Sequence, residues 1–440
     1  MISAIANKRL HERTDLDKRT WIAYSNYWND RFVFLGGASM PVPYANELHW
    51  PNGLTPFDGW SREIQADPFR HYAWMRENAP LLKAASADGD VWFVSRYADV
   101  VKALKSAKAF SSVLADPEKM PFMLFLDPPL HDRLRHVVAA WFTPTQVARY
   151  EGLVEGLAEQ AMEGVAGSES FDFVERFAAQ VSIGTITRFL GTEVNDYAKL
   201  RHWTDQFASY NGRISGRSPG SSNDERDALE FVNFMNARLR DAGQGDGLID
   251  HISNLWREGA LSEVHATHFC VNLFNAGHDT TTGLLSNSIT HLAENALIYE
   301  RLREQSDDIP KFIEEMARYK GTLQRVARLT TREVELGGET IPGGTKIRLL
   351  LGSANRDSEK FANGDVFDID RDTDGHVGFG FGVHACLGAW LARLETRVSL
   401  SVLLKRTTQI SLVGQSARQP YTGGTMANYG ARSLQTRIRG

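Results

Sequence analysis

One cysteine near the end of the chain has the surroundings of a reactive thiol or a metal ligand. Cys386 lies in the glycine-rich segment 379–388, and apolar residues recur in steps of three and four from Leu387 onward, which predicts a buried helix face. Cys386 therefore lies just before that helix or in its first turn. The unpaired N–H groups and the positive dipole end there favour a thiolate, which binds metal ions. Gly382 and Gly388 allow tight turns and a close approach of the backbone to a bulky planar ligand.

A second segment with catalytic side chains lies inside a long predicted helix. That helix begins after Ser262 and runs to roughly Leu302, with a break near Asn295. It carries the sequence Ala276-Gly277-His278-Asp279-Thr280. The glycine leaves room where a planar cofactor passes, the threonine hydroxyl can bond to the backbone and admit water, and Asp279 is a proton source beside it. His278 falls on another face and is interpreted as structural, and Cys270 as a core residue.

Together these segments resemble the cytochrome P450 family of haem-thiolate monooxygenases. The pattern Phe379-x-x-Gly382-x-His384-x-Cys386-x-Gly388 is similar to the loop that carries the axial cysteine ligand of the haem iron in that family. The segment 276–280 resembles the family's oxygen-activation motif. The resemblance covers roughly residues 65 to 440 and implies a mainly α fold, a single cytochrome P450-like domain with a minor β region. We expect an N-terminal extension at 1–45 and the haem-thiolate monooxygenase domain at 46–440.

A third motif, Glu315-x-x-Arg318, is similar to the family's Glu-x-x-Arg, which ties its helix to the segment before the cysteine loop. An arginine often precedes the phenylalanine of that segment in the family, whereas Val366 precedes Phe367 here. Arg371 is therefore the candidate third partner of the Glu315–Arg318 pair.

The resemblance implies that the cofactor is haem b (iron protoporphyrin IX). His131 and Arg135, four residues apart on a helix after a proline pair, would donate to the haem propionates, because cationic donors suit two carboxylates. The expected cofactor-binding residues are Cys386, the metal ligand, with His131, Arg135, Arg328, His376, His384, Phe379, Gly388, Ala276 and Gly277. The expected catalytic residues are Thr280 and Asp279.

Several apolar side chains on a connecting segment predict contact with a substrate. Residues 120–126 are almost entirely apolar, although connecting segments are usually polar. Filling a gap in the core is about as good an explanation as lining a cavity. With Val326, which follows from the resemblance, the substrate-binding candidates are Phe122, Met123 and Phe125.

The remaining pattern predicts helices with a few short strands. The runs 81–84 and 91–94 read as a hairpin, 97–107 as a helix, 333–341 as two short strands around a glycine pair, and 346–351 as a strand. Residues 146–208 are predicted to be mainly helical. The segments expected to border the cavity are a flexible loop at 211–223 and a hairpin tip at Gly423-Gly424.

Composition sets outer limits on function. The 440 residues carry a net charge of -5, which gives no sign of a nucleic-acid partner, and two cysteines, which exclude a disulfide framework. The charged first twenty residues and the lack of an 18-residue apolar run predict neither a signal peptide nor a membrane anchor. We therefore expect a cytoplasmic protein of the soluble bacterial kind.

The resemblance implies reductive activation of O2 and insertion of one oxygen atom into an organic substrate. No glycine-rich dinucleotide fingerprint follows a strand, so electrons should come from a separate ferredoxin or flavodoxin. The substrate is expected to be a lipophilic compound of small or medium size, aromatic or terpenoid-like. The alternatives are a peroxide-driven haem-thiolate enzyme, a non-enzymatic haem sensor, and a zinc site formed by His376, His384 and Cys386.

Overall fold

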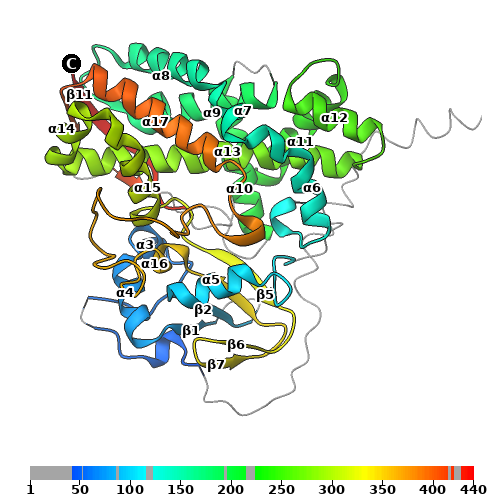
Figure 1. Cartoon of the computed structure of the whole chain (residues 1–440), viewed down its shortest axis with the longest axis vertical. Helices are drawn as coiled ribbons and strands as arrows, with labels where there is room; N and C mark the ends of the chain where they lie inside the picture. Colours follow the sequence, from blue (N-terminus) through cyan, green and yellow to red (C-terminus); the bar gives the residue numbers. More distant parts are fainter. Residues whose placement is uncertain are drawn as a thin grey trace, which may run out of the picture.

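The computed structural model describes residues 42–51, 53–85, 89–114, 122–192, 196–214, 223–414, 418–420 and 428–440. The helices are α3 (Arg62–Ala66), α4 (Phe69–Asn78), α5 (Tyr97–Lys105), α6 (Leu130–Ala139), α7 (Pro144–Ala148), α8 (Glu151–Val165), α9 (Ala179–Leu190), α10 (Tyr197–Ile214), α11 (Asp224–Asp241), α12 (Leu248–Arg257), α13 (Glu263–Glu294), α14 (Ala296–Glu304), α15 (Ile309–Tyr319), α16 (Leu351–Ala354) and α17 (Ala389–Arg406). Most of them gather in the upper part of Figure 1, and the largest sheet lies below with α3, α4, α5 and α16.

The strands form a minor β region, as predicted. The five-stranded sheet has the order β1-β2-β8-β5-β3, in which β2 and β8 run parallel and the other neighbours antiparallel. A short hairpin pairs β6 with β7, and β11 pairs with β10, β4 and β9. Their bounds are β1 (Leu81–Ala84), β2 (Val91–Val94), β3 (Phe110–Ser111), β4 (Phe171–Asp172), β5 (Val326–Thr330), β6 (Val334–Leu336), β7 (Glu339–Ile341), β8 (Lys346–Leu349), β9 (Gln409–Leu412), β10 (Arg418–Pro420) and β11 (Ala431–Arg439).

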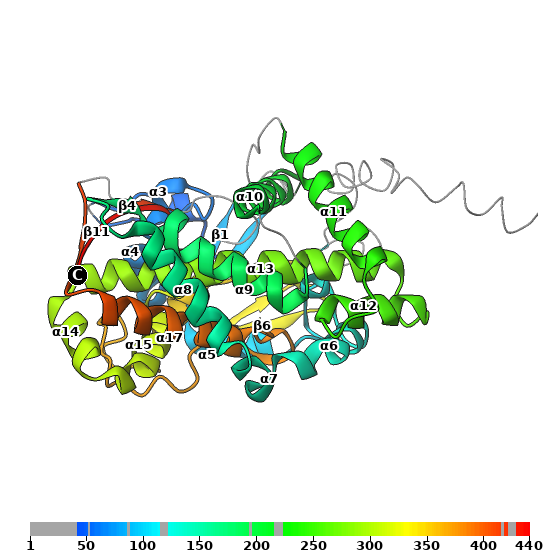
Figure 2. The same ribbon diagram turned by 90° about the horizontal axis from the view of Figure 1, so that it is seen from above.

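The long helix α13 crosses the middle of the molecule. Seen from above in Figure 2, α10 and α11 lie on one side of it and α17 on the other. Its N-terminus is capped by Ser262, whose hydroxyl accepts the N–H of His265 at 3.2 Å. It ends at Glu294, and Asn295 separates it from α14, so the predicted break near Asn295 is confirmed. No helix among the described residues is both long enough and apolar enough to span a membrane.

Several boundaries differ from the sequence prediction, among them the end of the helix predicted at 97–107, which stops at Lys105. Helix α10 continues to Ile214, past the predicted start of a loop at residue 211. The helix as a whole packs along α11. Residues 215–222 and the predicted hairpin tip at 423–424 lie outside the described residues. Strand β8 ends at Leu349, where the chain turns into α16. The side chains of Val42 and Ala45 are already buried in the core, so the described packing begins slightly before residue 46.

The buried Glu315–Arg318 pair holds α15 against the segment that leads to the cysteine loop. Arg318 Nε lies 2.7 Å from Glu315 Oε2, and both side chains are 0% exposed. Arg318 also donates to the carbonyls of Asn355 and Gly364, at 2.6 and 2.8 Å. Arg371 Nε lies 3.4 Å from Glu315 Oε1, which confirms it as the third partner. The burial of this cluster distinguishes it from an ordinary surface ion pair.

We expect Arg318→Met to lower the free energy of unfolding by about 3 to 5 kcal/mol, because it leaves the Glu315 carboxylate buried without its main partner. Arg303→Met is the control, since Arg303 lies 3.7 Å from the exposed Glu300 and such pairs contribute at most about 1 kcal/mol. Urea unfolding followed by circular dichroism measures both. Equal effects of the two substitutions would contradict a structural role for the buried cluster.

Candidate functional site

The loop before α17 presents the Cys386 thiol to open space. The cysteine N–H donates to the carbonyl of Phe379 at 2.7 Å, which closes the loop, and the thiol is exposed. Gly382 has φ 70°, and a Cβ placed on it would lie 2.5 Å from the carbonyl oxygen of Leu104. Only glycine fits this position, so the glycine-rich pattern shapes the loop itself. Cys386 lies three residues before Ala389, the first residue of α17.

The Cys386 side chain borders open space, but the protein atoms packed around the loop still desolvate the thiolate and raise the pKa of the thiol. The N–H of Gly388 and the charges of Arg135 and Arg393 act in the opposite direction. The sequence predicted that the helix start favours the thiolate, and this is wrong for the protein without a bound metal. Desolvation of the thiolate outweighs the N–H of Gly388 and the two arginine charges. A bound metal cation would deprotonate a coordinating thiol, so the residue still suits metal ligation.

Four cationic or imidazole side chains gather near this loop from α6, β5 and the loop itself. The rings of His131 and His384 lie 4.3 Å apart. The pKa of His384 is lowered to about 3, first by burial and then by the charges of Arg328, His131 and Arg135. Burial also lowers the pKa of Arg328 to about 10, against the effect of Asp127. Such a cluster is costly unless an anion neutralises it.

His131 provides the test of whether these residues fit a haem. Its side chain is buried, and its Nε2 has no hydrogen-bond partner among the described residues, while Nδ1 lies 2.9 Å from Asp132. Buried polar atoms are normally paired, so this nitrogen indicates a missing polar ligand. A group with two carboxylates would satisfy His131 and neutralise Arg135 and Arg328. The residues present therefore fit a haem whose propionates lie at this cluster.

His376 lies apart from this cluster. Its Nε2 is 3.1 Å from Glu314 Oε2, and its Nδ1 accepts the N–H of Gly378 at 3.1 Å. Glu314 also binds Arg393, and these two partners lower its pKa to about 2 despite the opposing effect of burial. Because both nitrogens of His376 are engaged, we leave it out of the proposed propionate contacts. In the described part of the chain no group of three or more potential ligands could hold a metal ion, which gives no support to the zinc alternative.

On α13, one face remains open within an otherwise buried helix. Ala276 is exposed although it lies in the middle of the helix, and Thr280 one turn later is partly exposed. The Thr280 hydroxyl donates to the Ala276 carbonyl at 2.8 Å, which is the backbone bond expected from the sequence. Asn272, one turn earlier, shares this face, and its amide donates to the carbonyl of His268. This face is where a planar cofactor and a substrate can approach the helix.

Gly277 lies on the face of α13 that packs against α9. A Cβ placed on it would lie 2.7 Å from Cδ1 of Ile186, so the residue allows α13 to pack closely on α9. The structure thus gives Gly277 a packing role, and it supplies no support for the proposed contact with a planar cofactor.

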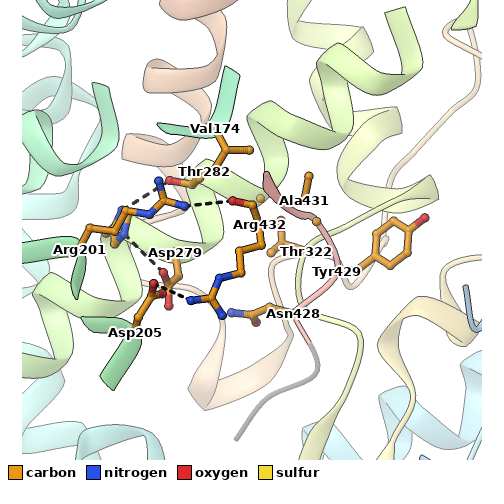
Figure 3. Close-up of a pocket in the computed structure, with 13 residues that line it drawn as sticks. Val174, Arg201, Asp205, Asp279, Thr282, Thr322, Asn428, Tyr429, Ala431 and Arg432 are labelled. Atoms are coloured by element: carbon orange, nitrogen blue, oxygen red, sulfur yellow. Dashed lines mark hydrogen bonds and ion pairs between the residues drawn. The ribbon is translucent and has the colours of Figure 1, made fainter. Parts of the chain in front are cut away.

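Asp279 lies in a small cavity away from the open face. Its carboxylate is 3.5 Å from Nε2 of His278, and the cavity also contains Arg201, Asp205 and Arg432 (Figure 3). Burial raises the pKa of Asp279 from 3.8 to about 7, with a smaller contribution from Asp205. The sequence did not indicate Arg201, Asp205 and Arg432 as neighbours, because they come from two distant segments, α10 and β11. The only local signal is that Arg201 and Asp205 are four residues apart and share one face of α10.

The substrate-binding candidates divide into a core residue and three partly exposed ones. Phe122 is buried and packs against Phe207 and His268, with ring centroids 6.0 and 5.2 Å apart, as the core explanation anticipated. Met123, Phe125 and Val326 are partly buried and remain available to a ligand.

Comparison with known proteins identifies the family. A model of the family described as Cytochrome P450 matches residues 228–409. Cytochrome P450 109 of Bacillus spizizenii is 31% identical over 348 residues, which cover 78% of this chain and 85% of that protein. The chain belongs to the cytochrome P450 family. The Biotin biosynthesis cytochrome P450 of Bacillus subtilis is 30% identical over 369 residues, 80% of this chain and 92% of that one.

Solved structures of cytochromes P450 share the fold. CYP109E1 from Bacillus megaterium, in complex with testosterone, is 28% identical with a TM-score of 0.77, and the match covers 86% of this chain and 99% of that one. P450BioI, in complex with an acyl carrier protein that bears hexadec-9Z-enoic acid, is 27% identical with a TM-score of 0.77, and the match covers 86% and 100%. The mainly α fold with a minor β region is therefore confirmed, and membership of the family implies a haem-thiolate cofactor and monooxygenase chemistry.

We expect Asp279→Asn to stabilise the protein above pH 7 by up to about 4 kcal/mol. The folded-state pKa of about 7 lies above the ordinary 3.8, so burying the charged carboxylate costs stability as the pH rises through this interval. The advantage of the substitution should disappear as the pH falls toward 4. Thermal unfolding at pH 4, 6 and 8 measures it.

Asp308→Asn is the control with the opposite sign. Hydrogen bonds from Lys311 and Arg301 lower the pKa of Asp308, so its replacement should destabilise the protein at pH 8. A pH-independent effect of Asp279→Asn would show that this carboxyl group is not perturbed in the folded protein.

Proposed function

We propose that this cytochrome P450 is a haem b monooxygenase that inserts one oxygen atom of O2 into a lipophilic substrate of small or medium size. The observation that supports this best is the combination of an exposed Cys386 thiol, an unsatisfied His131 and an open face at Ala276 and Thr280. When bound, the haem supplies the reductive activation of O2 and the transfer of the oxygen atom. We further propose that residues 46–440 form the catalytic domain, that 1–45 is an extension, and that the protein is cytoplasmic.

The proposed binding of the cofactor uses one ligand and one cationic cluster. Cys386 would hold the iron through its thiolate. Arg135 and Arg328 would hold the two propionates through charge-assisted hydrogen bonds, with His131 and the neutral His384 beside them. His384 Nε2 lies 2.9 Å from the hydroxyl of Ser112, which orients the ring for this role.

Proton transfer is assigned to the neighbouring residues Asp279 and Thr280. With a pKa of about 7, the Asp279 carboxyl group carries a proton in a large fraction of molecules at neutral pH and can also release it, which suits a general acid. The Thr280 hydroxyl can pass the proton on when it turns away from the Ala276 carbonyl. Burial keeps bulk water from bypassing this route.

Met123, Phe125 and Val326 support a lipophilic substrate, aromatic or terpenoid-like, because all three are apolar and partly exposed beside the site. The testosterone bound by CYP109E1 is a compound of this solubility class. The amide of Asn272 on the open face would bind a polar group of such a substrate.

The proposed electron donor is a separate ferredoxin or flavodoxin that docks on the cysteine side. Trp390, four residues after Cys386, is 51% exposed, and exposed tryptophans are frequent anchors of protein contacts.

The decisive experiment compares two ways of driving the purified protein. With O2, NAD(P)H, a ferredoxin and its reductase, we expect oxygenated product from a lipophilic compound that shifts the haem absorption band on titration. Omission of the ferredoxin should abolish turnover. Equal or better turnover with H2O2 alone would favour the peroxide-driven alternative, and binding without product in either system would favour a sensor.

We expect Thr280→Ala to lower the product formed per NAD(P)H by about tenfold or more while O2 consumption continues, because proton delivery contributes about 10² to 10⁴ in rate. Thr290→Ala is the matched control, since Thr290 lies on the same helix and its hydroxyl also bonds to a backbone carbonyl, at 2.7 Å. Thr280→Ser should restore most of the coupling. Equal coupling in Thr280→Ala and Thr290→Ala would remove Thr280 from the proposed route.

A further inference from the structure

We propose that the substrate carries an uncharged hydrogen-bond donor, a hydroxyl or an N–H group, at the end of its lipophilic body remote from the oxidised carbon, and that Asn275 on α13, with Asn272 beside it, accepts the hydrogen bond from this group. The inference rests on the proposed monooxygenase function and deepens it. It names the functional group that selects the substrate and the part of the substrate that is oxidised.

Asn275 has a buried hydrogen-bond acceptor that the protein leaves unused. Its side-chain oxygen is buried and has no hydrogen-bond partner among the described residues, although the residue as a whole is partly exposed. Buried polar atoms are normally paired, so this oxygen indicates a donor that the described part of the chain does not supply. Asn275 directly precedes Ala276, the exposed residue in the middle of α13, so such a donor can reach it from the open face.

Asn272 presents a second acceptor on the same side of the helix, three residues earlier. Its amide nitrogen donates to the carbonyl of His268 at 2.7 Å, and only the nitrogen of a side-chain amide can donate to a carbonyl. This contact fixes the orientation of the side chain, so the amide oxygen is the acceptor that Asn272 offers to a ligand. The two asparagines therefore favour a ligand that donates hydrogen bonds.

The side of α13 that carries the asparagines also faces apolar residues near the open space. His268, two helix turns before Asn275, lies on this side and packs against Phe122, with ring centroids 5.2 Å apart. Phe122 in turn contacts Phe125, whose ring is 6.1 Å away and partly exposed. A few polar groups in an otherwise apolar site fix the orientation of a small ligand.

The charges near the asparagines favour an uncharged group over a carboxylate. The sequence of α13 contains neither lysine nor arginine, and neither does the segment 120–126. Burial lowers the pKa of His268 to about 4, so its ring is neutral at physiological pH. Asp279, one turn after Asn275, has a pKa of about 7 and is negatively charged in part of the molecules. An anionic group would therefore be desolvated without a cation from α13 and repelled by Asp279.

The position of the asparagines determines which part of the substrate is oxidised. Thr280, to which proton transfer is assigned, lies about 8 to 12 Å further along the helix than Asn275 and Asn272, at a rise of about 1.5 Å per residue. The bound donor group is thus about two helix turns from the carbon that reacts. One oxygen atom of O2 enters a C–H bond there, and the other leaves as water with two protons. The ferredoxin or flavodoxin supplies the two electrons, and the hydroxyl or N–H group is unchanged.

The first test measures the binding of three matched steroids to the haem-loaded protein by absorption titration. Androstanol carries a hydroxyl, androstanone a carbonyl, and an androstane carboxylate an anion on the same skeleton, which is long enough to reach from Asn275 to Thr280. We expect androstanol to bind about fivefold to tenfold more tightly than androstanone, the effect of one hydrogen bond, and the carboxylate to bind most weakly.

Three outcomes of this titration would overturn the proposal. Equal affinities for androstanol and androstanone would show that water satisfies Asn275. Tighter binding of the ketone would show that the amide nitrogens face the ligand. Tightest binding of the carboxylate would show that a cation lies within reach of the site.

Variants locate the interaction through the ratio of the two affinities, alcohol to ketone, within each protein. Asn275→Leu removes the acceptor at similar volume and should bring the ratio to about one, whereas Asn275→Asp keeps an oxygen acceptor and should preserve the preference. Asn272→Leu should lower the ratio less, because its oxygen is not buried. Asn236→Leu on α11 is the control, since its amide is engaged by Glu263 and Thr267, at 3.1 and 2.8 Å. A wild-type ratio in Asn275→Leu would overturn the proposal.

Product analysis tests the position of oxidation. With O2, NAD(P)H, a ferredoxin and its reductase, androstanol should keep its hydroxyl and receive the new oxygen on a ring remote from it. Conversion of androstanol to androstanone would overturn the assigned orientation. Preferential binding of androstanol without product in either driving system would count against the monooxygenase function and leave the binding site supported.

Discussion

The buried ion pair between Glu315 and Arg318 is the interaction on which the position of the cysteine loop depends. Arg318 binds carbonyls of the segment that follows α16, and Asn355 of that segment accepts the N–H of Val377 at 2.6 Å. Gly378 then passes so close to α15 that a Cβ would lie 2.2 Å from the Ala317 carbonyl oxygen. A continuous set of buried polar contacts thus runs from α15 to the start of the loop. Such a cluster fixes the position of the cysteine loop more than it stabilises the fold, because the desolvation of its buried charges costs free energy.

A cationic cluster lies beside the cysteine loop, and a pair of carboxylates lies in the cavity on the other side of α13. His131, Arg135 and Arg328 face the space beside the cysteine loop, where an anionic cofactor edge would neutralise them. On the other side of α13, two carboxylates share a cavity with two arginines. Thr280 lies between these environments, with its hydroxyl on the open face and its carbonyl bonded to Thr322 of the cavity wall. In the proposed mechanism, one helix would thus serve both the cofactor and the supply of protons.

Local sequence patterns predicted the elements well, because apolar periodicity and capping residues act over a few residues. They located α13, its break at Asn295, the hairpin of β1 and β2, and the loop that presents Cys386. They failed where distant segments decide the outcome. The packing of Gly277 on Ile186 depends on a neighbouring helix, and the raised pKa of Cys386 depends on desolvation by the atoms around the loop. The neighbours of Asp279 come from α10 and β11, which no spacing rule connects.

The central claim is that the Cys386 thiolate binds a haem iron, and the absorption spectrum of the reduced, carbon-monoxide-bound protein tests it most directly. The account predicts a strongly red-shifted haem band in the wild type that disappears in Cys386→His, because a thiolate donates more electron density to the iron than an imidazole does. An imidazole-type spectrum in the wild-type protein would contradict it.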